Sequence, residues 1–359
     1  MKKWVVCLLL ALAVLPGCAL AAEVPEDLRD ALPREVTELL DGTDYSGETG
    51  FSSGVSAITA RVSAQLQNIL RERVRGAAAV LLIVLLCGVI DGVRPKGGAP
   101  GPDLMPMAGA LSVTMASAGS LDSLIGLGAG TMDTMSVFSK ALLPTLAAAA
   151  ASAGAMGTAT VQQVSAVFFA DLLLQLIHSL LLPMTYLYIG MLTAGAMLSD
   201  SRLSSVAAAL KKVIAWILGV SLIAFTGYLS VVRVITGSVD GAAVKAAKAA
   251  ISGAVPVVGS ILSDAAETVL AGACLLKNTI GVFGMLAVLA ICAIPFLQLG
   301  IQYLLYKLAA FLSGMIGPPE LCRLVDGLAG AFGLVLGMTG ACALLLLISI
   351  LSSIAAVVP

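Results

Sequence analysis

Long stretches without charge constrain this chain more than any other feature of its sequence. Residues 141–199 contain only two acidic or basic side chains, Asp171 and His178, and residues 278–306 and 327–359 contain none. A helix that crosses a bilayer needs about 20 consecutive apolar residues, so each stretch can span a membrane at least once. Only 11% of all residues are charged, against about a quarter in soluble domains. The sequence therefore predicts an all-α, polytopic membrane helix bundle of about six to eight spans.

The first spans differ in how clearly they are defined. Residues 76–90 are uncharged and rich in leucine, and they form the first expected transmembrane helix. Residues 104–132 are apolar but rich in Gly, Ala and Ser, and Asp122 interrupts them. We expect them to form either a span packed among other helices or an interfacial hairpin.

Prolines divide the longest apolar stretch, residues 141–199. Pro144 and Pro183 are expected break points, because proline interrupts the hydrogen-bond ladder of a helix, and the stretch is long enough for two or three spans. Residues 213–232 form a further span with Trp216 and Tyr228 near its ends, where interfacial aromatic residues belong. Residues 278–306 and 327–359 each provide one more span, with a margin for tilt or a break.

The N-terminus has the parts of a secretory signal. Met1–Lys3 is a cationic start, residues 4–15 are apolar, and Ala19–Ala21 offers the small residues that a signal peptidase reads. We expect cleavage after Ala21 or Ala22. Cys18, which follows a glycine, leaves a lipoprotein signal as a competing interpretation. An uncleaved anchor is a third option, although the apolar stretch falls short of the roughly 20 residues of a spanning helix.

A polar head follows this signal. Residues 1–76 hold 18 of the 41 Asp, Glu, Lys and Arg residues of the chain. Apolar residues recur at helical spacing within residues 28–39 and again within 55–70, which predicts two short amphipathic helices. Residues 41–47 are rich in turn-forming residues and should link them. If the signal is cleaved, this head lies on the far side of the membrane.

The spacing of prolines suggests an internal repeat. Pro144 and Pro183 recur 112 residues later as Pro256 and Pro295. Leucine and glycine positions that follow them recur with an offset of 118. These intervals predict a duplication of residues 122–236 onto 238–354, although chance matches are common in a sequence so rich in Leu, Ala and Gly. The halves would be parallel or inverted according to whether each has an even or an odd number of spans.

The expected division of the chain follows from these features. It consists of a signal peptide (1–22), a translocated amphipathic-helical head (23–75), a first transmembrane helix with its loop and small-residue segment (76–121), and two membrane halves (122–236 and 237–359).

Basic residues flank the first body span on both sides, so the positive-inside rule gives conflicting indications. Three arginines lie between residues 71 and 75, and Arg94 and Lys96 follow the span. We expect the signal to dominate and to place Arg94 and Lys96 in the cytoplasm. The next cytoplasmic loop is marked by three basic residues, Arg202, Lys211 and Lys212.

Ionisable residues inside apolar stretches are the candidate functional residues, because an uncompensated charge in lipid is costly. Asp171 and His178 are seven residues apart and therefore share one face of a helix. They could line a polar path or relay protons. Alternatively, Asp171 lies near a helix end and His178 donates to a neighbouring carbonyl.

A second candidate group lies further along the chain. Asp264 and Glu267 are three residues apart and share a helical face, and Lys277 lies ten residues beyond Glu267. The two carboxylates could bind a cation or act as acid and base. Alternatively, they lie on an interfacial helix whose polar face is wet or meets a partner. Lys307, which follows two tyrosines, is interpreted as an interfacial anchor.

No catalytic or metal-binding motif is present in the sequence. No nucleotide-binding, zinc-protease or serine-hydrolase motif occurs. The single histidine argues against a His-based metal site, and none of the seven cysteines has Cys-x-x-Cys spacing. A net charge of −1 gives no basic surface for nucleic acid. We therefore expect no enzyme activity, no cofactor and no metal.

A set of short motifs lies between Val244 and Ala310. They are Val244–Lys248 through Pro256–Gly259, Ser263–Thr268, Leu275–Asn278 and Tyr306–Ala310. With these motifs, the signal and the acidic head, the chain resembles the stage III sporulation protein AE family of endospore-forming Firmicutes. The resemblance covers nearly the full length and is most specific from Val244 to Ala310.

The resemblance implies a multispanning component of the channel complex, or feeding tube, that joins the mother cell to the engulfed forespore. Its implied partners are an operon-encoded ATPase, ring-forming subunits and a forespore membrane protein, and its implied location is the mother-cell membrane around the forespore. The family offers no catalytic residues. The alternative function is a self-sufficient, ion-coupled secondary transporter that uses Asp171, His178, Asp264 or Glu267.

Overall fold

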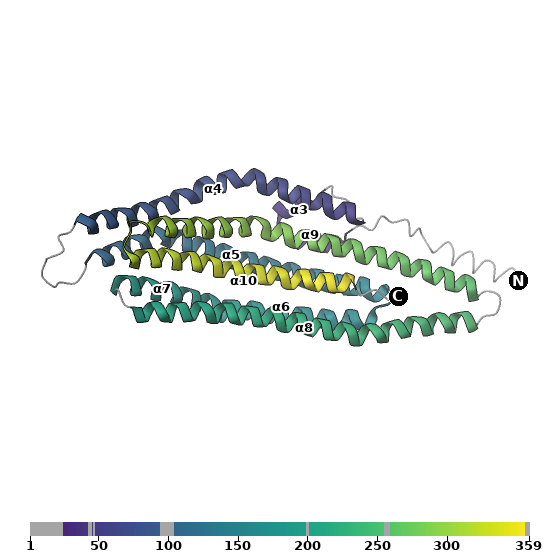
Figure 1. Ribbon diagram of the computed structural model, residues 1–359. Helices are drawn as coiled ribbons and strands as arrows, with labels where there is room; N and C mark the ends of the chain where they lie inside the picture. Colours follow the sequence, from purple (N-terminus) through teal and green to yellow (C-terminus); the bar gives the residue numbers. More distant parts are fainter. Residues whose placement is uncertain are drawn as a thin grey trace.

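The computed structural model describes residues 24–41, 45, 47–93, 104–198, 201–254 and 259–355. All regular structure within these residues is helical. Figure 1 shows an elongated bundle in which the long helices lie side by side and alternate in direction. The elements are α2 (Glu26–Asp30), α3 (Arg34–Leu40), α4 (Gly47–Val93), α5 (Leu104–Ser152), α6 (Met156–Leu176), the π-helical turn η1 (Ile177–Leu181), α7 (Leu182–Leu198), α8 (Ser201–Ala254), α9 (Gly259–Ser313) and α10 (Pro319–Ile354).

Six helices of the described chain are long and apolar enough to cross a membrane. They are α4, α5, the continuous α6–η1–α7, α8, α9 and α10. The number lies at the lower end of the expected range. Residues 104–132 belong to one helix, α5, so the hairpin alternative for this segment is wrong. Residues 141–199 contain the end of α5 and one further span, fewer than the two or three spans expected.

The prolines interrupt the helices less than expected. Pro144 lies inside α5, and the chain turns only after Ser152, where Gly154 adopts a φ of 91° that favours glycine. Pro295 likewise lies inside α9. Before Pro183 the helix forms the turn η1 instead of ending. Membrane helices tolerate proline because neighbouring helices and local π-type turns satisfy the freed carbonyl groups.

The polar head packs on the bundle. Pro33 separates α2 from α3 where one amphipathic helix was expected, and the second expected helix continues into the first span as α4. Tyr45 packs edge-on against Phe283 of α9, with ring centroids 5.2 Å apart. Residues 1–23, with the predicted signal, and most of the predicted linker lie outside the described residues. Translocation of the head stays a prediction.

α10 lies at the centre of the bundle and packs against α5, α6, α7, α8 and α9. Its glycines allow this close packing, because small residues let membrane helices approach one another. A Cβ atom at Gly327 would overlap the side chain of Leu192 on α7, and one at Gly333 would lie 3.2 Å from the ring of Tyr303 on α9. In the most apolar segments of α9 and α10, 61% of the residues are buried in the bundle, whereas in α8 only 11% are buried. α8 therefore lies at the periphery.

Several helices are much longer than a membrane is thick. α8 and α9 contain 54 and 55 residues, or about 80 Å each at 1.5 Å per residue, whereas the hydrocarbon core measures about 30 Å. The uncharged stretch of α8 ends at Val232, before Arg233, and the helix continues over residues 233–254. The hairpin of α8 and α9 projects past the ends of α5 and α10 (Figure 1).

The opposite end of the bundle carries the other helix connections. α4 ends and α5 begins there, close to the points where α7 leads into α8 and α9 into α10 (Figure 1). α8 begins at Ser201 and α10 at Pro319, which reproduces the offset of 118 seen in the sequence. If α6–α8 and α9–α10 descend from a duplication, two spans per unit make the units parallel. The duplication itself stays a prediction.

Candidate functional site

A lysine–carboxylate ion pair and a histidine–carboxylate contact join α5 to the neighbouring α6 and η1. The Nζ atom of Lys140 lies 3.1 Å from Oδ1 of Asp171, and Nε2 of His178 lies 3.1 Å from Oδ1 of Asp133. The two α5 residues are seven apart, as are the two on α6 and η1. Seven residues are about two helical turns, so the antiparallel helices bring both pairs onto one seam.

Of the two alternatives for Asp171 and His178, the structure contradicts the one that places Asp171 near a helix end and His178 on a carbonyl. Asp171 lies well inside α6 and not near a helix end, and His178 contacts a carboxylate and not a carbonyl. Asp133 and Lys140 were not recognised as site residues. Their own seven-residue spacing was the available signal, but it becomes informative only once α5 and α6 are known to pack together.

The four side chains of this seam are accessible at the bundle surface. Their exposed fractions run from 37% for His178 to 58% for Asp133. A charged surface at membrane depth is costly against lipid and is normally covered by protein or hydrated. His178 lies on the π-helical turn η1. Single π turns often occur at functional sites, so this turn supports the seam as a candidate site.

His178 lies inside the candidate span that α6, η1 and α7 form. Ten residues separate His178 from Tyr188, whose hydroxyl donates to the Gly327 carbonyl at 2.9 Å, next to the charged residue Asp326. Ten helical residues rise about 15 Å, half of a hydrocarbon core of about 30 Å. If the charged level at Asp326 marks the membrane boundary, His178 lies near mid-bilayer.

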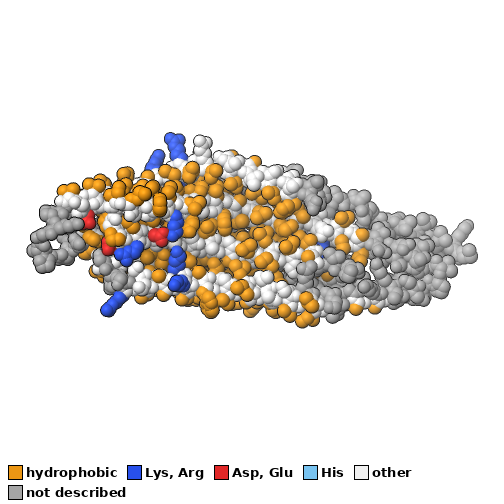
Figure 2. Space-filling view, in the orientation of Figure 1, with side chains coloured by type: hydrophobic (Ala, Val, Ile, Leu, Met, Phe, Trp, Pro, Cys, Tyr) orange, Lys and Arg blue, Asp and Glu red, His pale blue; other side chains and the backbone are white. Residues whose placement is uncertain are grey.

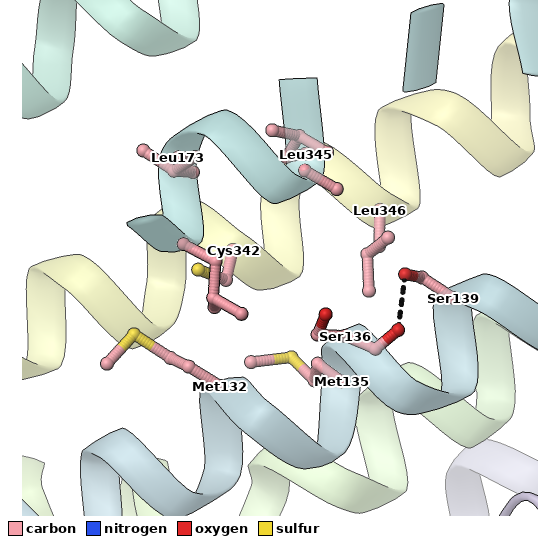
Figure 3. Close-up of a pocket in the computed structure, with 10 residues that line it drawn as sticks. Met132, Met135, Ser136, Ser139, Leu173, Cys342, Leu345 and Leu346 are labelled. Atoms are coloured by element: carbon pink, nitrogen blue, oxygen red, sulfur yellow. Dashed lines mark hydrogen bonds between the residues drawn. The ribbon is translucent and has the colours of Figure 1, made fainter. Parts of the chain in front are cut away.

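A small cavity lies behind the seam, between α5, α6 and α10 (Figure 3). Its volume is about 20 Å³, on the order of the space that one water molecule needs. The lining is mostly leucine, methionine and Cys342, and the Ser139 hydroxyl donates to the Ser136 carbonyl at 2.8 Å. This cavity is a packing void and not a substrate site.

The second candidate group is separated from this seam. Asp264 and Glu267 lie in the first three turns of α9, which begins at Gly259, and their side chains lie outside the described part. Lys277 lies within the candidate span of α9 and is only 1% exposed. Asp264 and Glu267 thus lie on a different helix from Asp171 and His178.

Lys307 is more than an interfacial anchor. Its ammonium group pairs with the carboxylate of Asp326 on α10 at 2.5 Å, and so ties α9 to α10. The preceding Tyr306 is buried and donates to the hydroxyl of Ser117 on α5 at 3.1 Å. Both residues therefore connect helices at the end of the bundle where α9 leads into α10.

Among the described residues, no group of three or more His, Cys, Asp and Glu residues is arranged to hold a metal ion. Cys292 and Cys342 are buried as small apolar residues, and Cys87, Cys274 and Cys322 are partly exposed.

Comparison with known proteins places the chain in a family. Residues 99–357 match the family described as Stage III sporulation protein AE. Stage III sporulation protein AE of Bacillus subtilis (strain 168) is 29% identical over 202 residues, which cover 54% of this chain and 49% of that protein. The alignment thus spans about half the length of this relative. No solved structure matches the chain. Because the family match extends over most of the sequence and over five of the six candidate spans, this chain belongs to the stage III sporulation protein AE family.

Proposed function

We propose that this protein is a non-enzymatic, multispanning component of the channel complex that joins the mother cell to the forespore. The observation that carries the proposal is the family match over residues 99–357, in a chain with six candidate spans. The proposed location is the mother-cell membrane around the forespore, and the proposed role is to anchor and organise the other subunits.

The projecting α8–α9 hairpin supports a role in assembly. Residues 233–254 extend α8 by about 33 Å beyond its uncharged stretch. Arg202, which we predict to be cytoplasmic, lies in the first turn of α8, and α8 begins at the end of the bundle opposite the hairpin (Figure 1). With that orientation, the hairpin reaches into the space between the two membranes. A rigid extension of this length is suited to contact ring-forming subunits and a forespore membrane protein there.

The cytoplasmic end suits a different class of partner. An ATPase of the same operon would bind at the level of the α7–α8 and α9–α10 connections. Arg202, Lys212 and Arg323 lie at or near these connections. Basic residues there can pair with acidic groups of a soluble partner.

The test is to shorten the hairpin without changing the spans. Deleting residues 242–248 and 261–267 removes two turns from each arm, or about 10 Å, and preserves the facing sides of the helices. We expect spore formation to fall to the level of a strain without the gene, and ring-forming subunits to be lost from affinity-purified complexes. Protein abundance in the membrane should stay normal.

Matched controls are Asp171→Asn and His178→Ala, which change charge within the spans and leave the hairpin intact. They should sporulate normally and retain the complex. Normal sporulation with a complete complex in the shortened variant would refute the assembly role.

A second candidate function is ion-coupled transport, and the His178–Asp133 pair favours it. A histidine and a carboxylate 3.1 Å apart on a seam deep in the span can exchange a proton with water. The purified protein in liposomes should then show proton- or ion-dependent uptake that His178→Ala abolishes. Uptake of this kind would contradict a purely organising role, and its absence together with normal sporulation of His178→Ala would exclude the transporter.

A further inference from the structure

A large cavity opens between α7, α8, α9 and α10, near the end where α9 leads into α10. Its volume is about 610 Å³, within the range of roughly 300–1,000 Å³ that is common for ligand pockets. It is far larger than the void behind the α5–α6 seam. Three cations, Lys211, Lys307 and Arg323, line it together with a single carboxylate, Asp326.

Two of the three cations already have carboxylate partners. Lys307 pairs with Asp326, and Arg323 lies 3.6 Å from Glu320, one turn earlier on α10. Lys211 differs, because no carboxylate in the described part of the chain lies within ion-pair distance of it. Among the described residues, Lys211 is therefore the one cation of the cavity without a carboxylate partner.

A glycine positions this charge. A Cβ atom at Gly330 of α10 would lie 2.8 Å from both the Lys211 Nζ and the Tyr188 hydroxyl oxygen. The absence of a side chain at Gly330 thus lets the ammonium group and the hydroxyl approach the same point on α10. Tyr188 is only 2% exposed, so a rigid side chain supports one wall of the cavity.

An exposed apolar stripe of α9 meets the cavity at Phe311. Leu304, Leu308, Phe311 and Met315 follow one another at spacings of four, three and four residues, which places them on one face of α9 and its C-terminal turn. Each is more than half exposed, Phe311 to 68%, and Phe311 also lines the cavity. Cationic groups thus lie directly beside an apolar stripe.

The position of the cavity relative to the membrane fits the same ligand chemistry. Figure 2 shows Lys and Arg side chains gathered in a band across this end of the bundle, with hydrophobic surface extending from it toward the other end. Basic pockets between membrane helices at the cytoplasmic boundary are suited to the phosphates of lipid headgroups.

We propose that the cavity between α7, α8, α9 and α10 binds the phosphate group of an anionic phospholipid, with Lys211 as its principal charged contact. Lys307 and Arg323 line the same cavity but are already paired, and the acyl chains lie along the exposed stripe of α9. The proposal does not depend on the channel role. A free phosphate ion shares the headgroup chemistry, but it would make no use of the apolar stripe.

The test is a binding titration with the full-length protein in nanodiscs of phosphatidylcholine or in detergent. Phosphatidylglycerol, phosphatidylcholine and inorganic phosphate are added separately, and bound lipid is counted by native mass spectrometry. We expect phosphatidylglycerol to bind preferentially, and Lys211→Gln to weaken this binding roughly tenfold, as loss of one charge-assisted contact does. Lys212→Gln, which changes the adjacent exposed lysine outside the cavity, should bind like the wild type.

Gly330→Ala provides a second variant that keeps every charge. It should displace the Lys211 ammonium group and weaken phosphatidylglycerol binding in the same direction. If inorganic phosphate displaces the lipid and this displacement requires Lys211, the cavity recognises the phosphate group itself. If inorganic phosphate does not displace the lipid, binding also requires the acyl chains. Equal binding of the two lipids, or equal effects of Lys211→Gln and Lys212→Gln, would overturn the proposal.

Discussion

The Nε2 atom of His178 lies 3.1 Å from the Asp133 carboxylate, although 45 residues separate the two in the chain. Lys140 and Asp171 form a similar contact further along the same two antiparallel helices. The α5–α6 seam is therefore defined by charge as well as by apolar packing. Because its charged side chains are accessible at the bundle surface, the stability of the seam depends on what surrounds the protein there.

The His178–Asp133 contact should be energetically coupled. Asp133→Asn and His178→Gln should each lower the free energy of unfolding, and the double variant should lose less than the sum. We expect a coupling energy of about 0.6 kcal/mol, the average measured for polar contacts between membrane helices, and no more than about 1.7 kcal/mol, the measured maximum. Unfolding in mixed micelles with a denaturing detergent measures it. Asp122→Asn, an exposed acid on the same helix without an ion pair in the described part, should be additive with His178→Gln.

The Lys140–Asp171 pair should tolerate reversal of both charges. Lys140→Asp alone places two acids together, and Asp171→Lys alone places two lysines together, so each should lower the free energy of unfolding by about 0.5–1 kcal/mol, as expected for exposed pairs. The combined variant should recover most of that loss. Unfolding curves measured side by side test this, and a double variant as unstable as the sum of its singles would show that the contact contributes nothing.

Gly88 should be intolerant of alanine. A Cβ atom there would overlap the carbonyl oxygen of Ile316 and lie 3.0 Å from the Cα of Gly317, both backbone atoms of the α9–α10 turn. Backbone atoms cannot rotate away, so we expect a loss of about 1–3 kcal/mol. Gly92→Ala is the control, because no atom lies within 4 Å of its Cβ position. Thermal unfolding in detergent should separate the two variants, and equal stability would contradict this packing.

Tyr188→Phe should weaken the contact between α7 and α10. It removes the hydroxyl that donates to the Gly327 carbonyl at 2.9 Å in a buried position, and a typical hydrogen bond contributes about 0.5–1.5 kcal/mol. Tyr186→Phe, at an exposed position on the same helix, should have little effect. Thermal unfolding in detergent measures both variants. Indistinguishable unfolding curves would show that the hydrogen bond from Tyr188 to Gly327 does not contribute to stability.

Single cysteines should report the alternation of the six spans. In a background without native cysteines, residues introduced at Ser201 and Pro319 should react with a membrane-impermeant reagent from one side, and at Ala155 from the other. These positions lie at opposite ends of the bundle. Labelling in intact cells and in inverted vesicles distinguishes the sides. Ser201 should be cytoplasmic, and labelling of Ser201 and Pro319 from different sides would be incompatible with the bundle.

Features that depend on a single helix, such as a shared face or an apolar span, could be predicted from the sequence. Asp171 and His178 share a face because their spacing is two turns, and residues 213–232 form a span because they are apolar throughout. Helix ends were harder to predict. Whether Pro144 ends a helix depends on which neighbours satisfy the carbonyl that it leaves free, and α5 continues past it.

The sequence by itself determined that this protein is a bundle of membrane helices, because apolar length and helical hydrogen bonding are local properties that lipid enforces. Only the tertiary structure decided that Asp133 and Lys140 are the partners of His178 and Asp171, and that Lys211 reaches Gly330 between α7 and α10. These contacts depend on which helix faces lie together. Packing of many small residues on several helices settles that choice, and no single stretch of sequence encodes it.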